Sequence, residues 1–262
     1  MWYNYYVNLS VKGEDMFNFE FDKKAVIIVI AIMLIAWISS MGTGELLTAL
    51  LSVPGVIIAM TFHEFAHAFA ADKLGDDTPR IQGRLNLNPL SHIDPIGLVL
   101  LLVAGFGWGK PVEINPRNFN GKYSLSKAEA IVAAAGPIMN FILAFIFMII
   151  TYVLFNATNI LNGLNYNTAS ILYAVLIDII SINIGLGVFN LIPLPPLDGS
   201  KVLMHFLSYN AKQWFYNNQR IFYIAFLILW ITGLLSSLLL PMISGVFAGM
   251  SWLAQKIVSI FI

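Results

Sequence analysis

The chain contains no cysteine among its 262 residues, which excludes disulfide bonds and thiolate ligands to a metal ion. Charged side chains are also scarce, at 11% of the residues, whereas a soluble domain carries about 25%. Hydrophobic residues make up 58%, and so few charges cannot cover a surface that faces water. The composition therefore predicts that a lipid bilayer surrounds the protein. The formal net charge is zero, so nothing indicates binding to nucleic acid.

Long apolar segments predict the transmembrane helices. A spanning helix needs about 20 apolar residues, with a range of about 17–25. The shorter, glycine-rich island at 96–109 favours a re-entrant or protein-buried loop instead. Residues 1–24 read as a cytosolic or interfacial tail. The sequence thus predicts an all-α polytopic membrane protein with about six spans. These spans are 25–41, 46–71, 130–155, 169–192, 221–240 and 242–262.

The basic residues divide unequally between the predicted connections. All 14 Lys and Arg lie in the N-terminal tail, between spans two and three, between spans four and five, or near the C-terminus. With six alternating spans, these positions fall on one side of the membrane, and the positive-inside rule makes that side cytosolic. We therefore expect a multi-pass protein of a bacterial plasma membrane with both termini in the cytosol. The sequence assigns no oligomeric state.

The second predicted span contains His63-Glu64-Phe65-Ala66-His67. At this spacing on a helix, the two imidazoles lie one turn apart on one face and can share a metal ion. Glu64 can reach a metal-bound water as a general base. Polar helix packing is the alternative, but a charged residue at the bilayer centre costs about 2.5–3.5 kcal/mol. Three ionisable residues within five positions therefore favour a metal site, with zinc as the expected cofactor.

A third protein ligand has to come from elsewhere in the chain, because hydrolytic zinc sites usually have three protein ligands and one water. Asp198 is the candidate, since it follows the proline-rich end of the fourth span at 190–197. Proline blocks regular helix, so this segment is expected to be extended and could turn Asp198 towards the metal. An ordinary Asp-Gly turn at the membrane surface explains the same residues equally well.

Together the two motifs resemble those of the site-2 protease family of intramembrane zinc metalloproteases. The segment 63–67 is similar to that family's first motif, and Asn190-x-x-Pro193 with 197–199 is similar to its second. The likeness covers at least residues 60–205 and includes 83–89 and 135–140. The resemblance implies that His63, His67 and Asp198 bind zinc and that Glu64 is catalytic.

The same resemblance implies a zinc metalloendopeptidase that hydrolyses a peptide bond near the cytosolic side of the bilayer. Its expected substrate is a membrane-spanning protein or a membrane-associated peptide. We expect a minimal form without a PDZ or nucleotide-sensing domain, in which residues 25–262 are one protease domain with a catalytic core at about 46–205.

Two further groups of residues are predicted to act on the substrate. Residues 84–88 alternate polar and apolar, as a short strand does, and an unpaired strand edge can bind an extended peptide. Arg84, Asn86 and Asn88 are therefore expected to contact the substrate, with a plain interfacial loop as the alternative. Asn140, in the third span, is expected to stabilise the oxyanion of the transition state. A simple interhelical hydrogen bond is the alternative for Asn140.

Two rival functional classes bury similar residues in membrane spans. A metal-ion transporter also places His and Asp in its helices, but it needs neither a glutamate beside the first histidine nor a glycine-rich loop. A catalytically inactive adaptor could retain the fold, but the complete His-Glu-His-Asp set argues against it. The sequence therefore favours the protease.

The absence of cysteine makes the predicted orientation directly testable. Single cysteines in Asn118→Cys and Asn210→Cys variants are expected to react only with thiol reagents that enter the cytosol. Those in Gly42→Cys and Asn162→Cys variants are expected to react with impermeant reagents outside intact cells, because the positive-inside rule places these connections there. The reverse labelling pattern would overturn the predicted topology.

Overall fold

The structure is a computed structural model that describes residues 31–32, 35–36, 38–40, 42–104, 107–157 and 165–261. The chain divides into two compact units, Met1–Gly42 and Thr43–Ile262. The predicted tail at 1–24 lies outside the described residues, as does most of the first predicted span. The fold and the site below belong to the second unit.

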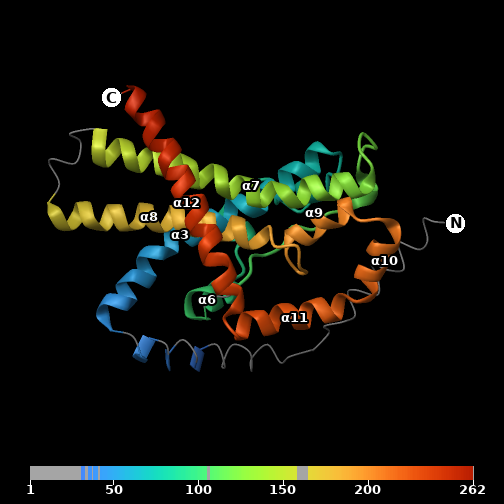
Figure 1. Cartoon of the computed structure of the whole chain (residues 1–262), viewed down its shortest axis with the longest axis horizontal. Helices are drawn as coiled ribbons and strands as arrows, with labels where there is room; N and C mark the ends of the chain where they lie inside the picture. The colour runs from blue at the N-terminus through green and yellow to red at the C-terminus, as the bar shows by residue number, and fades with distance from the viewer. Residues whose placement is uncertain are drawn as a thin grey trace. The chain divides into compact units, whose positions relative to one another are not determined.

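The described part of this unit is all helical, apart from turns and extended loops (Figure 1). Four helical segments are long and apolar enough to cross a membrane: Gly44–Lys73, Leu125–Phe155, Tyr166–Asn190 and Leu234–Ile260. These properties match the predicted all-α membrane protein. In chain order, the helices are α3 (Thr43–Lys73), α4 (Thr78–Ile81), α5 (Pro89–His92), α6 (Pro95–Ala104), η2 (Pro116–Asn118), α7 (Leu125–Tyr152), η3 (Val153–Ala157), α8 (Tyr166–Asn190), α9 (Asp198–Phe206), α10 (Tyr209–Asn217), α11 (Gln219–Ile231) and α12 (Leu234–Phe261).

The predicted boundary between spans five and six is wrong. Pro241 lies inside α12, whereas the break between α11 and α12 falls at Thr232 and Gly233. Gly233 has a φ of 73°, a backbone conformation that glycine adopts without the steric cost of a Cβ. Membrane helices tolerate proline because neighbouring groups satisfy the freed backbone carbonyl. Because the break falls at this position, α11 has only 13 residues, fewer than the about 17–25 of a normal span. The predicted count of six spans is therefore not confirmed.

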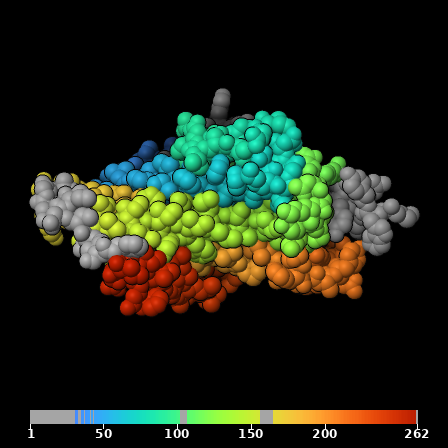
Figure 2. All heavy atoms as spheres, turned by 90° about the horizontal axis from the view of Figure 1, so that it is seen from above, coloured from blue at the N-terminus to red at the C-terminus, as the bar shows by residue number. Residues whose placement is uncertain are grey.

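Helices α3, α7 and α8 contact one another and form the centre of the unit. Small residues permit their close approach: a Cβ at Gly55 of α3 would lie 3.2 Å from the backbone of Ile179 of α8. Such residues are common where membrane helices pack, since lipid tails give no hydrophobic drive for association. Helix α12 contacts α7 and α8. Figure 2 shows α7 (yellow-green) between α3 (blue) and the C-terminal helices (orange to red).

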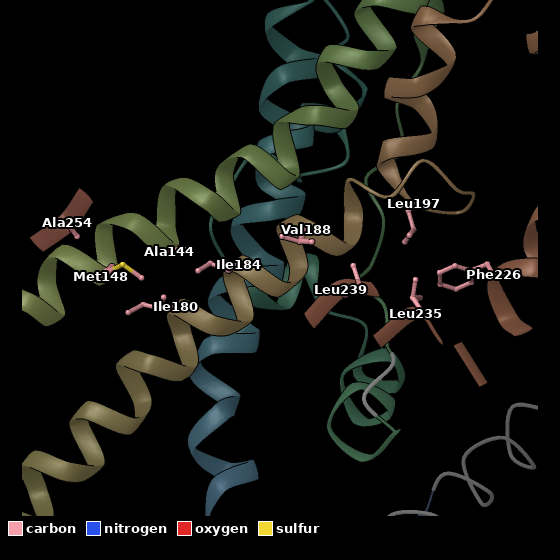
Figure 3. Close-up of a cluster of buried hydrophobic side chains, with 10 residues drawn as sticks. All are labelled: Ala144, Met148, Ile180, Ile184, Val188, Leu197, Phe226, Leu235, Leu239 and Ala254. Atoms are coloured by element: carbon pink, nitrogen blue, oxygen red, sulfur yellow. The ribbon is translucent and has the colours of Figure 1, made fainter. Parts of the chain in front are cut away.

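The largest apolar cluster lies where α7, α8, α11 and α12 meet. Figure 3 shows its side chains converging from these helices and from the loop before α9. The buried members are Ala144, Met148, Ile180, Ile184, Val188, Leu197, Phe226, Leu235, Leu239 and Ala254. This cluster fixes α7 and α8, the two helices that contact α3.

Asp76 organises the polar segment between α3 and α7. Its side chain is fully buried, and its Oδ1 accepts hydrogen bonds from the backbone and hydroxyl of Thr78, at 3.1 and 2.6 Å. Asn118 Nδ2 donates to the same oxygen at 3.0 Å, and Asn115 N donates to Oδ2 at 2.7 Å. A buried carboxylate with this many donors is stable in the interior. Asp76 therefore joins the start of the segment, at Thr78, to its end, at Asn115 and Asn118.

The predicted strand at residues 84–88 is not observed: the described chain forms bends there. Asn86 Oδ1 accepts from Asn88 N at 2.7 Å, and Asn88 Oδ1 accepts from Leu90 N at 3.1 Å. Asparagine side chains that bond their own backbone compete with strand pairing, and here the local bonds prevail.

The apolar island forms α6, after which the chain folds back on itself. Residues 107–115 form neither helix nor strand, apart from an isolated antiparallel bridge between Gly109 and Ile93. A Cβ on Gly97 would overlap the backbone of Trp108, so glycine permits this close return. The predicted entry of the segment into the membrane stays a prediction.

Candidate metal centre

Two histidines of α3 and an aspartate more than 130 residues later in the sequence converge between α3 and α9. His63 Nε2 and His67 Nε2 of α3 lie 3.0 Å apart, and each lies 3.1 Å from Asp198 Oδ2. Both histidines are buried, while the Asp198 side chain is 17% exposed. Among the described residues this is the one group of His, Asp and Glu arranged to hold a metal ion.

The chain after α8 brings Asp198 to the histidines. Turns carry it through the prolines to Leu197, and Asp198 is the first residue of α9. A Cβ on Gly199 would overlap the carbonyl of Leu191 at the end of α8, so glycine allows the two helix ends to meet. A carboxylate in the first turn also interacts favourably with the helix dipole.

Gly136 of α7 leaves room for the converging ligand atoms. A Cβ at this position would lie 2.5 Å from His67 Nε2 and 2.7 Å from His63 Nε2. Any larger residue would therefore enter the space that the imidazole edges share. The absence of a side chain on α7 is thus part of the site.

The hydrogen bonds of the other ring nitrogens fix the tautomers of the two imidazoles. His63 Nδ1 lies 2.6 Å from Asn140 Oδ1, and His67 Nδ1 lies 2.7 Å from the carbonyl oxygen of Val132. Because both partners are acceptors, each Nδ1 carries the proton, and each neutral ring turns the lone pair of Nε2 towards Asp198. Three acceptor atoms then face one another, an arrangement that a cation stabilises.

The spacing of these atoms fits zinc. Zinc bonds to histidine nitrogen are about 2.0–2.1 Å long, and tetrahedral geometry then places ligand atoms about 3.3–3.4 Å apart. The observed separations of 3.0–3.1 Å require only small movements to match. The two-histidine, one-carboxylate set is also a common ligand set of catalytic zinc.

The charge state of Asp198 suits a ligand. In the metal-free site, burial raises the pKa of the Asp198 carboxyl, but positive charge on His67, present when that ring is protonated, outweighs burial and holds the pKa below its usual range. Asp198 is therefore a carboxylate at neutral pH, as metal binding requires.

Glu64 lies beside the three ligand atoms in a cavity of ≈ 790 Å³. Its Oε2 accepts a hydrogen bond from Val112 N at 3.1 Å, while Oε1 has no hydrogen-bond partner among the described residues. The cavity is lined by His63, His67 and Asp198 and by parts of the segment 107–115, including Trp108, Val112 and Ile114. One oxygen of Glu64 is thus fixed and the other is available for chemistry.

Asn140 lies behind His63 and does not line the cavity. It is fully buried, its Oδ1 faces His63, and its Nδ2 donates to the carbonyl of Ala59 and to Asn183 Oδ1, both at 3.0 Å. Both amide hydrogens are therefore used away from the cavity. These contacts favour a role in orienting His63 over the predicted donation to an oxyanion.

The predicted substrate-binding residues are engaged within their own loop. Arg84 is buried and donates to the carbonyls of Ser91 and Lys110, and Asn86 Nδ2 donates to the carbonyl of Gly83. The carbonyl of Asn86 lies 2.7 Å from Nε2 of buried His92, so His92 is also a loop residue here. None of these residues lines the cavity.

Two charged residues of the cavity were not identified from the sequence. Glu129 of α7 lies seven residues before Gly136, on the same helix face, and Lys201 of α9 lies three residues after Asp198. The sequence could have indicated both residues through helical spacing. Residues three or seven positions from a motif residue lie on the same helix face as that residue. Gly136 itself stands in the 135–140 segment of the resemblance, but its contact with the imidazoles follows only from packing.

A bundle of membrane helices that encloses two histidines, an aspartate and a free glutamate defines a metal-dependent membrane hydrolase. The sequence model of peptidase family M50 matches residues 52–232. The chain belongs to this family, which confirms the resemblance to site-2 proteases and the predictions of a zinc metalloprotease and of zinc as cofactor. It is a multi-pass membrane protein.

Three relatives carry the name "Putative zinc metalloprotease". YwhC of Bacillus subtilis (strain 168) is 40% identical over 190 residues, which are 72% of this chain and 84% of YwhC. MJ0611 of Methanocaldococcus jannaschii is 28% identical over 71% of this chain and 86% of its own. Rip2 of Mycolicibacterium smegmatis is 27% identical over 63% of each chain. No solved structure matches the chain.

The contact of Gly136 with both imidazoles makes it a test of the site. We expect Gly136→Ala to reduce bound zinc from about one ion per chain to near zero, because the new methyl group occupies the space of the ligand atoms. Zinc is measured by metal analysis of the purified protein. Gly245→Ala is the matched control, since a Cβ on Gly245 of α12 meets no atom within 4 Å. Wild-type zinc content in Gly136→Ala would contradict this arrangement.

Proposed function

We propose that the protein hydrolyses a peptide bond of a membrane-spanning or membrane-associated protein near the cytosolic side of the bilayer. The observation that carries this proposal is the convergence of His63, His67 and Asp198 within 3.0–3.1 Å beside the free oxygen of Glu64. These three residues would hold zinc through Nε2, Nε2 and Oδ2. When bound there, zinc supplies Lewis-acid polarisation of the scissile carbonyl and lowers the pKa of water.

Glu64 is the proton carrier in this proposal. Its Oε1 accepts a proton as the water oxygen forms a bond to the carbonyl carbon of the substrate. The same carboxyl then gives that proton to the leaving nitrogen as the C–N bond breaks, so Glu64 is regenerated. The backbone N–H of Val112 at 3.1 Å keeps the carboxylate at the cavity wall during both transfers.

The segment at residues 107–115, which already makes one strand-like bridge through Gly109, is our candidate for substrate binding. A peptide must be extended to be cut, because a helix hides its carbonyls, and an extended segment can pair with it through the main chain. Trp108, Pro111, Val112 and Ile114 line the cavity next to Glu64. Arg84 then acts indirectly, since its bonds to Ser91 and Lys110 fix the loops that support this segment.

The position of the ligands along α3 supports cleavage towards one membrane surface. His67 lies six residues before Lys73, the last residue of α3, or roughly 9 Å at 1.5 Å per residue. Asp198 similarly follows the end of α8. In the predicted topology both of these ends face the cytosol.

Replacing Glu64 separates chemistry from metal binding. We expect Glu64→Gln to reduce cleavage by about 10²–10⁴-fold, the usual contribution of a general base, while zinc content stays at the wild-type level. Because uncut substrate should remain bound, membrane proteins that co-purify with this variant are identified by mass spectrometry. Each is then incubated with wild-type enzyme, and the products are measured.

The matched control is Glu45→Gln, which changes another glutamate of α3 in its first turn. It should cleave the captured protein at the wild-type rate. Cleavage by Glu64→Gln at that rate would contradict the proposed base. A metal-ion transporter would instead show zinc flux that Glu64→Gln leaves unchanged.

A further inference from the structure

A series of buried amides continues behind His63 into α8. Asn140 Oδ1 lies 2.6 Å from His63 Nδ1, and Asn140 Nδ2 donates to Asn183 Oδ1 at 3.0 Å. Asn183 Nδ2 in turn donates to the carbonyl of Ile179 at 2.8 Å. Both asparagines have no exposed surface. The series therefore links α3, α7 and α8 through polar groups that water does not reach.

The far end of the series determines the direction of every bond in it. The carbonyl of Ile179 can only accept, so Asn183 must turn its NH₂ group towards it and its Oδ1 towards Asn140. Only the NH₂ group of Asn140 matches that oxygen. Asn140 Oδ1 therefore faces His63, and His63 must donate from Nδ1. Reversing either amide would place two donors or two acceptors face to face in the interior.

The carbonyl of Ala59 also accepts from Asn140 Nδ2, at 3.0 Å, but this oxygen is shared. Ala59 lies four residues before His63, so its carbonyl is also the acceptor for the helical N–H of His63. Asn183 Oδ1 has no such second partner among the described residues. The orientation of the Asn140 amide thus rests on two acceptors, of which Asn183 Oδ1 is the one that a side-chain substitution can remove.

This orientation matters for the metal. If Asn140 presented its NH₂ group instead, His63 would have to accept at Nδ1 and carry its proton on Nε2. A protonated Nε2 has no lone pair for a metal ion. A partner that fixes the tautomer of a ligating histidine typically contributes a factor of about 10–100 in metal affinity.

We propose that Asn183 is a positioning residue for the metal centre, which acts through Asn140 to keep Nε2 of His63 unprotonated. Asn183 does not line the cavity and lies on a different helix from either ligand-bearing element. This inference rests on the proposed zinc site and assigns a function to a residue that neither sequence motif contains.

The test measures the zinc dissociation constant of the full-length protein in detergent, by competition with a chelator. We expect Asn183→Leu to weaken zinc binding by about 10-fold, the lower end of the range for a direct partner of a ligating histidine, because Asn183 acts through Asn140. Asn183→Asp should remain within about threefold of wild type, because a carboxyl that stays neutral in this buried position donates to the carbonyl of Ile179 and accepts from Asn140, as the amide does. If Asn183→Leu does not fold, Asn183→Ala carries the same expectation.

Thr151→Val is the matched control for loss of a buried polar group. Thr151 lies on α7 with Asn140, and its hydroxyl donates to the carbonyl of Phe147 at 2.8 Å without contact to the site. We expect Thr151→Val to bind zinc as wild type does. Thermal unfolding of the metal-free proteins shows whether any variant changes stability as well.

A second measurement shows whether Asn183 acts through Asn140. In an Asn140→Ala background, Asn183→Leu should cause no further loss of zinc affinity, because the connection to His63 is already absent. Fully additive losses would overturn the proposed relay, as would wild-type affinity in folded Asn183→Leu. A wild-type protein that binds no zinc would instead overturn the proposed site itself.

Discussion

The site depends on holding three hydrogen-bond acceptors together at the wall of a cavity in a largely apolar bundle. His63 Nε2, His67 Nε2 and Asp198 Oδ2 lie within 3.0–3.1 Å of one another in a chain with only 11% charged residues. In so apolar a bundle, converging lone pairs and a carboxylate are unfavourable until a cation joins them. The contacts of the neighbouring helices maintain this arrangement.

Different elements hold the three ligand atoms in place in different ways. Val132 and Asn140 of α7 accept from the rear of the two imidazoles, and Gly136 between them leaves the front clear. Gly199 allows α9 to start against the end of α8, which delivers the carboxylate. Helix α7 is thus the scaffold for the histidines of α3, and it lies between α3 and α12 (Figure 2).

The sequence predicted the parts of the molecule that local spacing determines. The i, i+4 histidines had to share a helix face, and the Asp-Gly after three prolines had to begin a new direction, so the ligand group followed once the resemblance was recognised. Contacts between distant segments were not predictable. Asn86 and Asn88 alternate as in a strand, yet their side chains bond their own backbone. Pro241 was expected to separate spans five and six, but the helix break falls at Gly233, which has a positive φ. The partners of Asn140 depend on the crossing of three helices.

The central claim is that α3 and α9 together hold one zinc ion through two imidazoles and one carboxylate. X-ray absorption at the zinc edge of the purified protein tests it most directly. Our account predicts nitrogen and oxygen ligands at about 2.0–2.2 Å, with scattering from two imidazoles in the wild type and from one in His63→Ala protein reloaded with zinc. A wild-type spectrum with three or more imidazoles would contradict it, since that would require His92 or His205 as a ligand.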